Sequence, residues 1–321
     1  MKRNIKDYFL ITLKGIAMGA ADVVPGVSGG TIAFITGIYE ELIDTINKID
    51  LNAFKTLKQK GIKYAWHSIN GNFLTALFIG IAISILSLAK GIKWMLHNEP
   101  VLLWSFFFGL VLASIFYVGK QIKTFNFNII IAIILSSIAS YFLTLAEPFT
   151  SPESPLYLLF CGFVAIIAMI LPGVSGAFIL LILGAYQTTI DTINDLAQGL
   201  FTKDFNLFKE ALINFLMLVV GAILGLKIFS KILNWLFKNY KDLTLAMLTG
   251  FMIGSLNKIW PWKKILTWRV NSKGLSVPLT EQSILPTNVE GDNQLALASV
   301  LITIGFIVIL LLEKFGPENE K

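Results

Sequence analysis

Long apolar stretches separated by short polar links run along almost the whole chain. Six of them approach the length of about 20 residues that an α-helix needs to cross the hydrocarbon core of a bilayer. This pattern predicts an all-α polytopic membrane protein with six spanning helices. The stretches are Phe73–Ala89, Val101–Val118, Ile129–Ala146, Leu212–Leu226, Leu243–Ile259 and Leu295–Leu312.

Two further apolar regions, residues 8–39 and 156–186, are interrupted near the middle by Pro-Gly. Each arm of such a region has only about 10–15 residues, which is too short to cross a bilayer. A chain can turn back inside a membrane where protein or water shields the opened backbone. We therefore expect each region to form a re-entrant helical hairpin.

The two interrupted regions are copies of one another. Residues 15–47 and 162–194 are identical at 16 of 33 positions, at a constant offset of 147. At an offset of 141 the match continues into the following apolar stretches, through Gly80/Gly221, Trp94/Trp235 and Gly109/Gly250. We expect two repeats, 1–150 and 151–321, each with one re-entrant hairpin and three spanning helices, the second with an external loop at 260–294. Duplicated halves of this size are typical of secondary transporters.

The distribution of Lys and Arg favours an inverted second repeat. If each interrupted region is re-entrant, each half crosses the membrane three times, and the second copy points the opposite way. Cytoplasmic segments carry an excess of Lys and Arg. The inverted arrangement places 17 of them inside and 9 outside, against 12 and 14 for parallel halves. We therefore expect inverted repeats with cytoplasmic termini, although the external loop contains Lys263, Lys264, Arg269 and Lys273.

The composition supports the membrane assignment. The chain of 321 residues is 55% hydrophobic and 14% charged, with a mean hydropathy of +0.72, whereas soluble domains carry about 25% charged residues. A soluble globule and a disordered chain are both excluded as leading classes. The net charge of +6 then reflects cytoplasmic loops facing anionic lipid, and no nucleic-acid partner is expected. One Cys and two well-separated His predict neither a disulfide nor a metal site, and no cofactor is expected.

The Pro-Gly breaks carry the candidate chemistry. Pro25, Gly26, Pro172 and Gly173 are expected to form the turns, because proline ends a helix and glycine permits a tight turn. A serine follows each turn at a helix N-cap position, and the free N–H groups beyond it favour an anion. The alternative is that the breaks are kinks whose glycines serve helix packing. The expected anion-binding residues are Ser28, Gly29, Gly30, Thr31, Ser175 and Gly176.

A few charged residues near the breaks are candidates for coupling transport to protons or sodium. Asp22 precedes the first turn, and a carboxylate at membrane depth is costly enough to need a role or a partner. It either couples the movement of ions, or it caps the helix or pairs with Lys14 near the membrane surface. Each of the others also has a plain interpretation, as a helix cap or an interfacial charge. They are Asp44, Asp191, Glu40 and Lys227, the last also a candidate for gathering a phosphate.

The stretch from Gly19 to Thr31, which contains Asp22-Val-Val-Pro-Gly-Val-Ser-Gly-Gly, resembles the polyprenyl-phosphate transporter (PopT) family, as does its weaker copy at Leu171–Gly176. The resemblance covers the whole chain in length, motif pair and helix layout. It implies a flippase in the bacterial cytoplasmic membrane that moves undecaprenyl phosphate to recycle the lipid carrier of cell-wall synthesis. The substrate is implied only by this resemblance, since the residues themselves indicate an anion. A homodimer remains open.

The motif is also similar to that of the undecaprenyl-pyrophosphate phosphatases, which have a Pro-Gly-x-Ser-Arg-Ser-Gly turn. Here the Arg is absent, and Gly29 and Gly176 follow the serines. Phosphoryl transfer needs fixed positive charge on the equatorial oxygens, and neither Arg3 nor Arg269 is near a turn in sequence. We therefore predict a transporter with no catalytic residues. The alternatives are a membrane phosphatase, a small-anion carrier or channel, and a structural partner of cell-wall enzymes.

Overall fold

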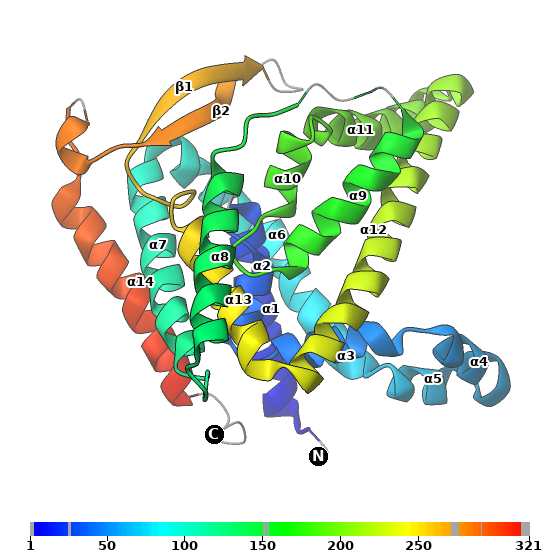
Figure 1. Ribbon diagram of the computed structural model, residues 1–321. Helices are drawn as coiled ribbons and strands as arrows, with labels where there is room; N and C mark the ends of the chain where they lie inside the picture. The colour runs from blue at the N-terminus through cyan, green and yellow to red at the C-terminus, as the bar shows by residue number, and fades with distance from the viewer. Residues whose placement is uncertain are drawn as a thin grey trace.

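The computed structural model describes residues 3–24, 27–149, 152, 154–270, 276–289 and 291–315, which are mostly helical (Figure 1). The first half contains α1 Ile5–Val23, α2 Gly29–Ile35, α3 Tyr39–Lys48, α4 Leu51–Lys60, α5 Ile62–Ser68, α6 Gly71–Asn98, α7 Pro100–Gly119 and α8 Phe127–Thr144. The second half contains α9 Pro155–Ile170, α10 Gly176–Ile182, α11 Tyr186–Thr202, α12 Phe205–Asn239, α13 Lys241–Ser255 and α14 Leu295–Phe315. Two strands and a short 3-10 helix, Pro286–Asn288, lie between α13 and α14.

Four helices of the described chain, α6, α7, α8 and α12, are each long and apolar enough to cross a membrane. A fifth is reached if α10 and α11 count as one span, but these two meet at 108°. The helices confirm a multi-pass membrane protein. The expected span Leu243–Ile259 forms a shorter element, α13, of 15 residues, whereas the expected span Leu295–Leu312 lies within α14, which has 21 residues.

The duplication seen in the sequence is visible in the helix packing. Helix α1 packs along α6, and its counterpart α9 packs along α12. The remaining pairs cross between the halves, because α8 packs on α13 and α14 packs on α7. Matched glycines allow the close approach: a Cβ on Gly80 would collide with the backbone of α1, and one on Gly221 with the backbone of α9. The two halves therefore interlock and share one bundle.

The two interrupted regions enter this bundle from opposite ends (Figure 1). Helix α1 starts at the end where α3, α4 and α5 lie, and α2 returns toward that end. Helix α9 starts at the opposite end, the end at which the strands also lie, and α10 returns there to meet α11. Each region thus turns back inside the bundle.

The arms of each interrupted region are unequal, so the expected lengths of 10–15 residues are wrong. The incoming helices have 19 and 16 residues and each outgoing helix has 7. Gly37 and Gly184 end the outgoing helices in the left-handed conformation, with φ of 72° and 68°. Glycine adopts this conformation without steric cost, which explains its presence at both equivalent positions.

The external loop expected at 260–294 contains a β-hairpin, so the chain is not purely helical. Strand β1, Lys263–Val270, pairs antiparallel with β2, Ser276–Ser283. Two tryptophans close the loop on itself: Trp260 Nε1 donates to Ile284 O and Trp262 Nε1 donates to Asn293 O, both at 2.8 Å. The ring of Trp260 also packs on Phe108 of α7, with 5.3 Å between the ring centroids.

The interlocked packing predicts opposite effects for two alanine substitutions in α6. Gly91 has open space around it, so Gly91→Ala should leave the melting temperature in detergent unchanged or raise it, because alanine favours helix by about 1 kcal/mol. Gly80→Ala should lower it, since overpacking against α1 costs about 1–3 kcal/mol. Equal melting temperatures for the two variants would contradict the close approach of α1 and α6.

Candidate functional site

The first outgoing arm is hydrogen-bonded directly to the turn of the second interrupted region. Ser28 Oγ donates to Met169 O at 3.1 Å, and the backbone N–H of Gly173 donates to Thr31 Oγ1 at 2.9 Å. Tyr39, at the start of α3, donates its hydroxyl to Ile170 O at 2.9 Å. The two breaks, which are more than 140 residues apart in sequence, therefore meet inside the bundle.

Glycine is required where the two breaks touch. A Cβ on Gly30 would lie 2.7 Å from Ile170 O and 2.8 Å from Met169 O, so a side chain there would force α2 away from α9. Gly173 has φ of 84°, and a Cβ there would lie 2.7 Å from Ser255 Oγ. Pro172 is buried next to it. The expected turn residues Pro25 and Gly26 lie outside the described residues.

The N–H groups at the start of α2 are already bonded, so the expectation that they are free is wrong. Ser28 is the N-cap, and its Oγ accepts from Gly30 N at 3.1 Å. Its carbonyl oxygen accepts from Thr31 N at 2.9 Å. The N–H of Gly29 donates to Asp22 Oδ1 at 2.7 Å. The anion at this helix end is therefore the protein's own carboxylate, which is the contact that the capping interpretation of Asp22 predicts.

The second tip lacks this internal anion. Met169 stands where the first copy has Asp22, and its side chain lies against Gly176. Ser175 occupies the N-cap position of α10 but makes no side-chain capping hydrogen bond. Together with Ser140 and Lys258, it lines a small cavity. The duplicated motif thus has one closed copy and one copy whose polar groups face a cavity.

Lys258 is a residue that sequence reasoning missed. It follows α13, and its ammonium lies 4.5 Å above the ring of Phe178 and 3.7 Å from Glu281 Oε2. Burial lowers the pKa of Lys258, and the nearby Glu281 carboxylate only partly offsets this. The available signal was its position: a lysine inside the end of the expected span Leu243–Ile259, just before a basic loop that the positive-inside rule does not explain.

The other candidate charges have local partners. Glu40 pairs with Lys241 at 2.8 Å, and Asp44 pairs with Lys48 one turn later in α3. Asp191 accepts from Gln187 Nε2 at 3.0 Å. Lys227 donates to Ile46 O at 2.6 Å, near the end of α3. No group of three or more His, Cys, Asp or Glu that could hold a metal ion occurs among the residues that the structure describes.

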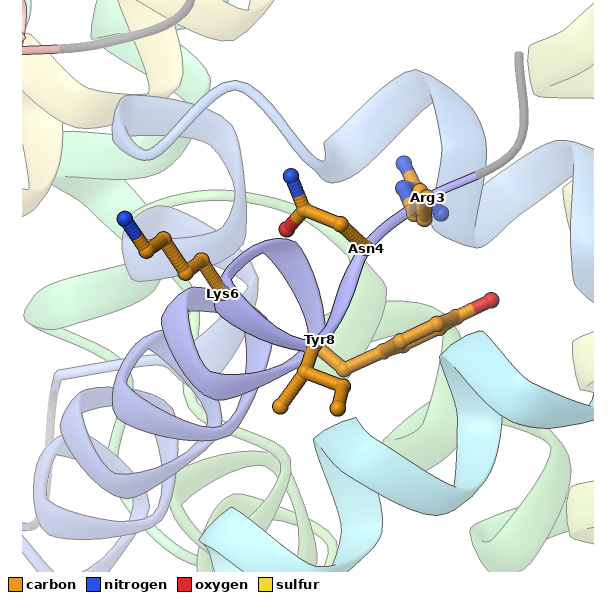
Figure 2. Close-up of a pocket in the computed structure, with 5 residues that line it drawn as sticks. Arg3, Asn4, Lys6 and Tyr8 are labelled. Carbon is orange, nitrogen blue, oxygen red and sulfur yellow. The ribbon is translucent and has the colours of Figure 1, made fainter.

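A separate hollow lies at the start of α1, lined by Arg3, Asn4, Ile5, Lys6 and Tyr8 (Figure 2). Its basic side chains do not converge, because Lys6 and Arg3 point in different directions. Arg3 is also neutralised by a two-point contact with Glu41, with both N–O distances at 2.5 Å. This hollow is therefore a weaker candidate for anion binding than the cavity at Ser175.

Comparisons of the sequence with known proteins point to one family. The family model described as undecaprenyl phosphate translocase-like matches residues 18–277. The chain is 44% identical over 322 residues to a polyprenyl-phosphate transporter of Vibrio cholerae, covering 99% of this chain and 100% of the relative. It is 30% identical over 320 residues to a polyprenyl-phosphate transporter of Staphylococcus aureus, covering 96% and 97%. No solved structure matches.

The contact between the tips predicts a specific loss of stability. Thr31→Val keeps the shape of the side chain but leaves the N–H of Gly173 without its acceptor, which should cost about 1–3 kcal/mol. Thermal unfolding in detergent and hydrogen exchange of the segment around Gly173 would measure this, and Thr31→Ser should restore both. Thr36→Val is the matched control, because the Thr36 hydroxyl bonds only to carbonyls of its own helix. Equal losses of thermal stability in Thr31→Val and Thr36→Val would contradict the prediction.

Proposed function

The chain belongs to the undecaprenyl phosphate translocase-like family, and on that premise we propose that it carries undecaprenyl phosphate, or a similar lipid-linked monophosphate, across the bacterial cytoplasmic membrane. The observation that carries this proposal is the 44% identity, along nearly all of both chains, to a protein named polyprenyl-phosphate transporter. Movement of the lipid would return the carrier for another round of cell-wall synthesis. The protein's partners are then the lipid substrate and the bilayer.

The proposed topology is a pair of inverted repeats, 1–150 and 151–321, with both termini cytoplasmic. The entry of α1 and α9 from opposite ends of the bundle supports it (Figure 1). So does the basic character of α4 and α5, which contain Lys55, Lys58, Lys60 and Lys63. Inverted repeats that meet at broken helices are a common way to build alternating access around one central site.

The proposed headgroup site lies between the two tips, with Ser28, Gly29, Gly30 and Thr31 on one side and Ser175 and Gly176 on the other. At the first tip a phosphate competes with the Asp22 carboxylate for the N–H of Gly29. At the second tip it meets the Ser175 hydroxyl beside Lys258. The cavity there holds about 10 Å³, close to one water molecule, so the tips must part to admit a headgroup. The polyprenyl tail stays in lipid.

The proposal includes transport without phosphate hydrolysis. Phosphoryl transfer requires positive charge held against the transferring group. Arg3 is paired with Glu41, and Arg269 lies over the ring of Tyr186, 5.0 Å from its centroid. Lys258 does supply a positive charge beside Ser175, but that cavity is lined by no His, Asp or Glu of the described chain, and a serine with no adjacent base is a weak nucleophile.

Asp22 is the proposed coupling residue, with the proton or sodium ion as its partner. Its carboxylate binds the same N–H group that the phosphate needs. Neutralising or displacing it would therefore free the first tip for the substrate. Glu40, Asp44, Asp191 and Lys227 are weaker coupling candidates, because each already holds a local partner.

The function predicts that the purified chain in liposomes moves labelled undecaprenyl phosphate between leaflets and releases no phosphate from undecaprenyl pyrophosphate. Replacing both Ser28 and Ser175 by alanine should slow this movement by about a hundredfold or more, as expected for the loss of two hydrogen bonds to a charged group. Ser175→Ala alone is the cleaner variant, because that hydroxyl makes no capping bond.

Ser87→Ala is the matched control, since Ser87 is exposed on α6 and bonds only to Ile83 O. Failure of the wild-type chain to move the lipid would refute the function. Normal movement by the double variant, with normal movement in the control, would refute the site.

If Asp22 couples transport to an ion, Asp22→Asn should change the response to an ion gradient without changing stability. The amide oxygen can still accept from Gly29 N, so the variant should keep its melting temperature. It should lose the acceleration of lipid movement by a proton or sodium gradient, because asparagine cannot exchange a proton or pair with a cation. Asp50→Asn, which changes the exposed N-cap carboxylate of α4, should leave this acceleration intact. A gradient response unchanged in Asp22→Asn would remove Asp22 from the coupling mechanism.

A further inference from the structure

Two lysines share one carboxylate beneath the β-hairpin. Lys258 lies between α13 and β1, Lys263 is the first residue of β1, and Glu281 is on β2. The Nζ atoms of both lysines lie 3.7 Å from the same oxygen, Glu281 Oε2. The three side chains are mostly buried, with 17%, 8% and 22% of their surfaces exposed. Two ammonium groups and one carboxylate leave this cluster with a formal charge of +1.

The positive charge is incompletely compensated. A distance of 3.7 Å is too long for a charge-assisted N–H···O hydrogen bond, which spans about 2.7–2.9 Å. Lys263 Nζ is buried without a hydrogen-bond partner among the residues that the structure describes, and it lies 3.8 Å above the ring of Trp104. Burial lowers the pKa of Lys263 to about 8, although Glu281 acts in the opposite direction. A buried ammonium with unused donors is costly unless another group supplies the missing contacts.

An ion pair that merely fastens the hairpin would not need this arrangement. The hairpin is already held by the indoles of Trp260 and Trp262, and Ser283 Oγ donates to Asn257 Oδ1 at 2.9 Å. A fastening pair would match one lysine to one carboxylate in direct hydrogen bonds. Here a second lysine is buried beside the first, and donors on both remain available. The extra positive charge and the unused N–H donors match an anion with several oxygens, which would accept hydrogen bonds from both lysines.

The cluster also adjoins the proposed transport site. Lys258 lines the same cavity as Ser175 and Gly173, at the tip that has no internal carboxylate. Lysine binds phosphate as a point charge with three rotatable donors. A phosphate held by Lys258 and Lys263 would therefore be next to the open tip.

We propose that Lys258 and Lys263 form a receiving site for a phosphate monoester on the hairpin side of the protein, and that Glu281 takes the place of the anion while the site is empty. The identity of the ester as a lipid headgroup rests on the proposed function. The chemistry of the site itself fits inorganic phosphate as well, so the test uses both.

The test measures binding of undecaprenyl phosphate and of inorganic phosphate to the purified full chain in detergent, by titration calorimetry. Lys258→Met and Lys263→Met should each weaken binding by about tenfold or more, because each removes a charged donor. Glu281→Gln should tighten binding by about threefold to tenfold, because it removes the competing charge. Lys264→Met is the matched control: Lys264 is the next residue of β1, is exposed, and faces Gln282 in the pairing register.

The opposite sign expected for Glu281→Gln separates an anion site from a structural ion pair. If Glu281 only holds the hairpin, the glutamine variant will bind the same or more weakly, which overturns the proposal. If Lys263→Met fails to fold, as judged by gel filtration and helical content, binding by Lys258→Met and Glu281→Gln still tests the anion site.

The two proposals fail in different ways. Unchanged binding in both lysine variants, while the wild type still moves the lipid, overturns the receiving site and leaves the transport function standing. A wild type that neither binds nor moves undecaprenyl phosphate overturns the function. In that case, inorganic phosphate binding that is lost in the lysine variants would keep the anion site. Binding of the lipid without inorganic phosphate, weakened in the lysine variants, supports a site that requires the tail.

Discussion

The architecture depends on how the chain satisfies the backbone groups that it opens inside an apolar bundle. A helix broken at membrane depth exposes N–H and C=O groups where lipid offers no partner. Here each break provides hydrogen-bond partners for the other. Ser28 and Tyr39 donate to carbonyls at the end of α9, and Thr31 accepts from Gly173. Each broken region needs the other, which gives a physical reason for the chain to contain two copies. The interlocked helix pairs hold these tips together.

The sequence was sufficient for those features that depend on local pattern and on comparison of the two halves. Apolar stretches predicted the main helices, and the repeat located both breaks and both N-cap serines. It could not show that the tips meet, because the bond between Thr31 and Gly173 joins residues 142 apart and depends on how α2 packs against α9. Nor could it show the hairpin: only the fold reveals that β1 and β2 pair, and that Lys263 turns inward while Lys264 remains exposed.

The repeat is most informative where it breaks down. At equivalent positions the first copy has Asp22 and the second has Met169, and this one difference changes the chemistry of the two tips. The carboxylate accepts from the N–H of Gly29, so another anion must compete with it at the first helix end. The thioether supplies no charge, so Ser175 remains without a capping bond beside Lys258. The two tips therefore differ in their chemistry, although the two motifs are copies.

The same asymmetry accounts for Lys263, one of the four basic residues that do not fit the expected charge distribution of the loops, and for Lys258 just before that loop. The positive-inside rule concerns charges that remain at the membrane surface, where they resist translocation. Lys258 and Lys263 are not surface charges: both are mostly buried, over the rings of Phe178 and Trp104. Burying an ammonium there costs free energy that topology alone does not require. These lysines fit the proposed phosphate site beside the second tip, and turns without arginine are suited to holding a phosphate that is later released.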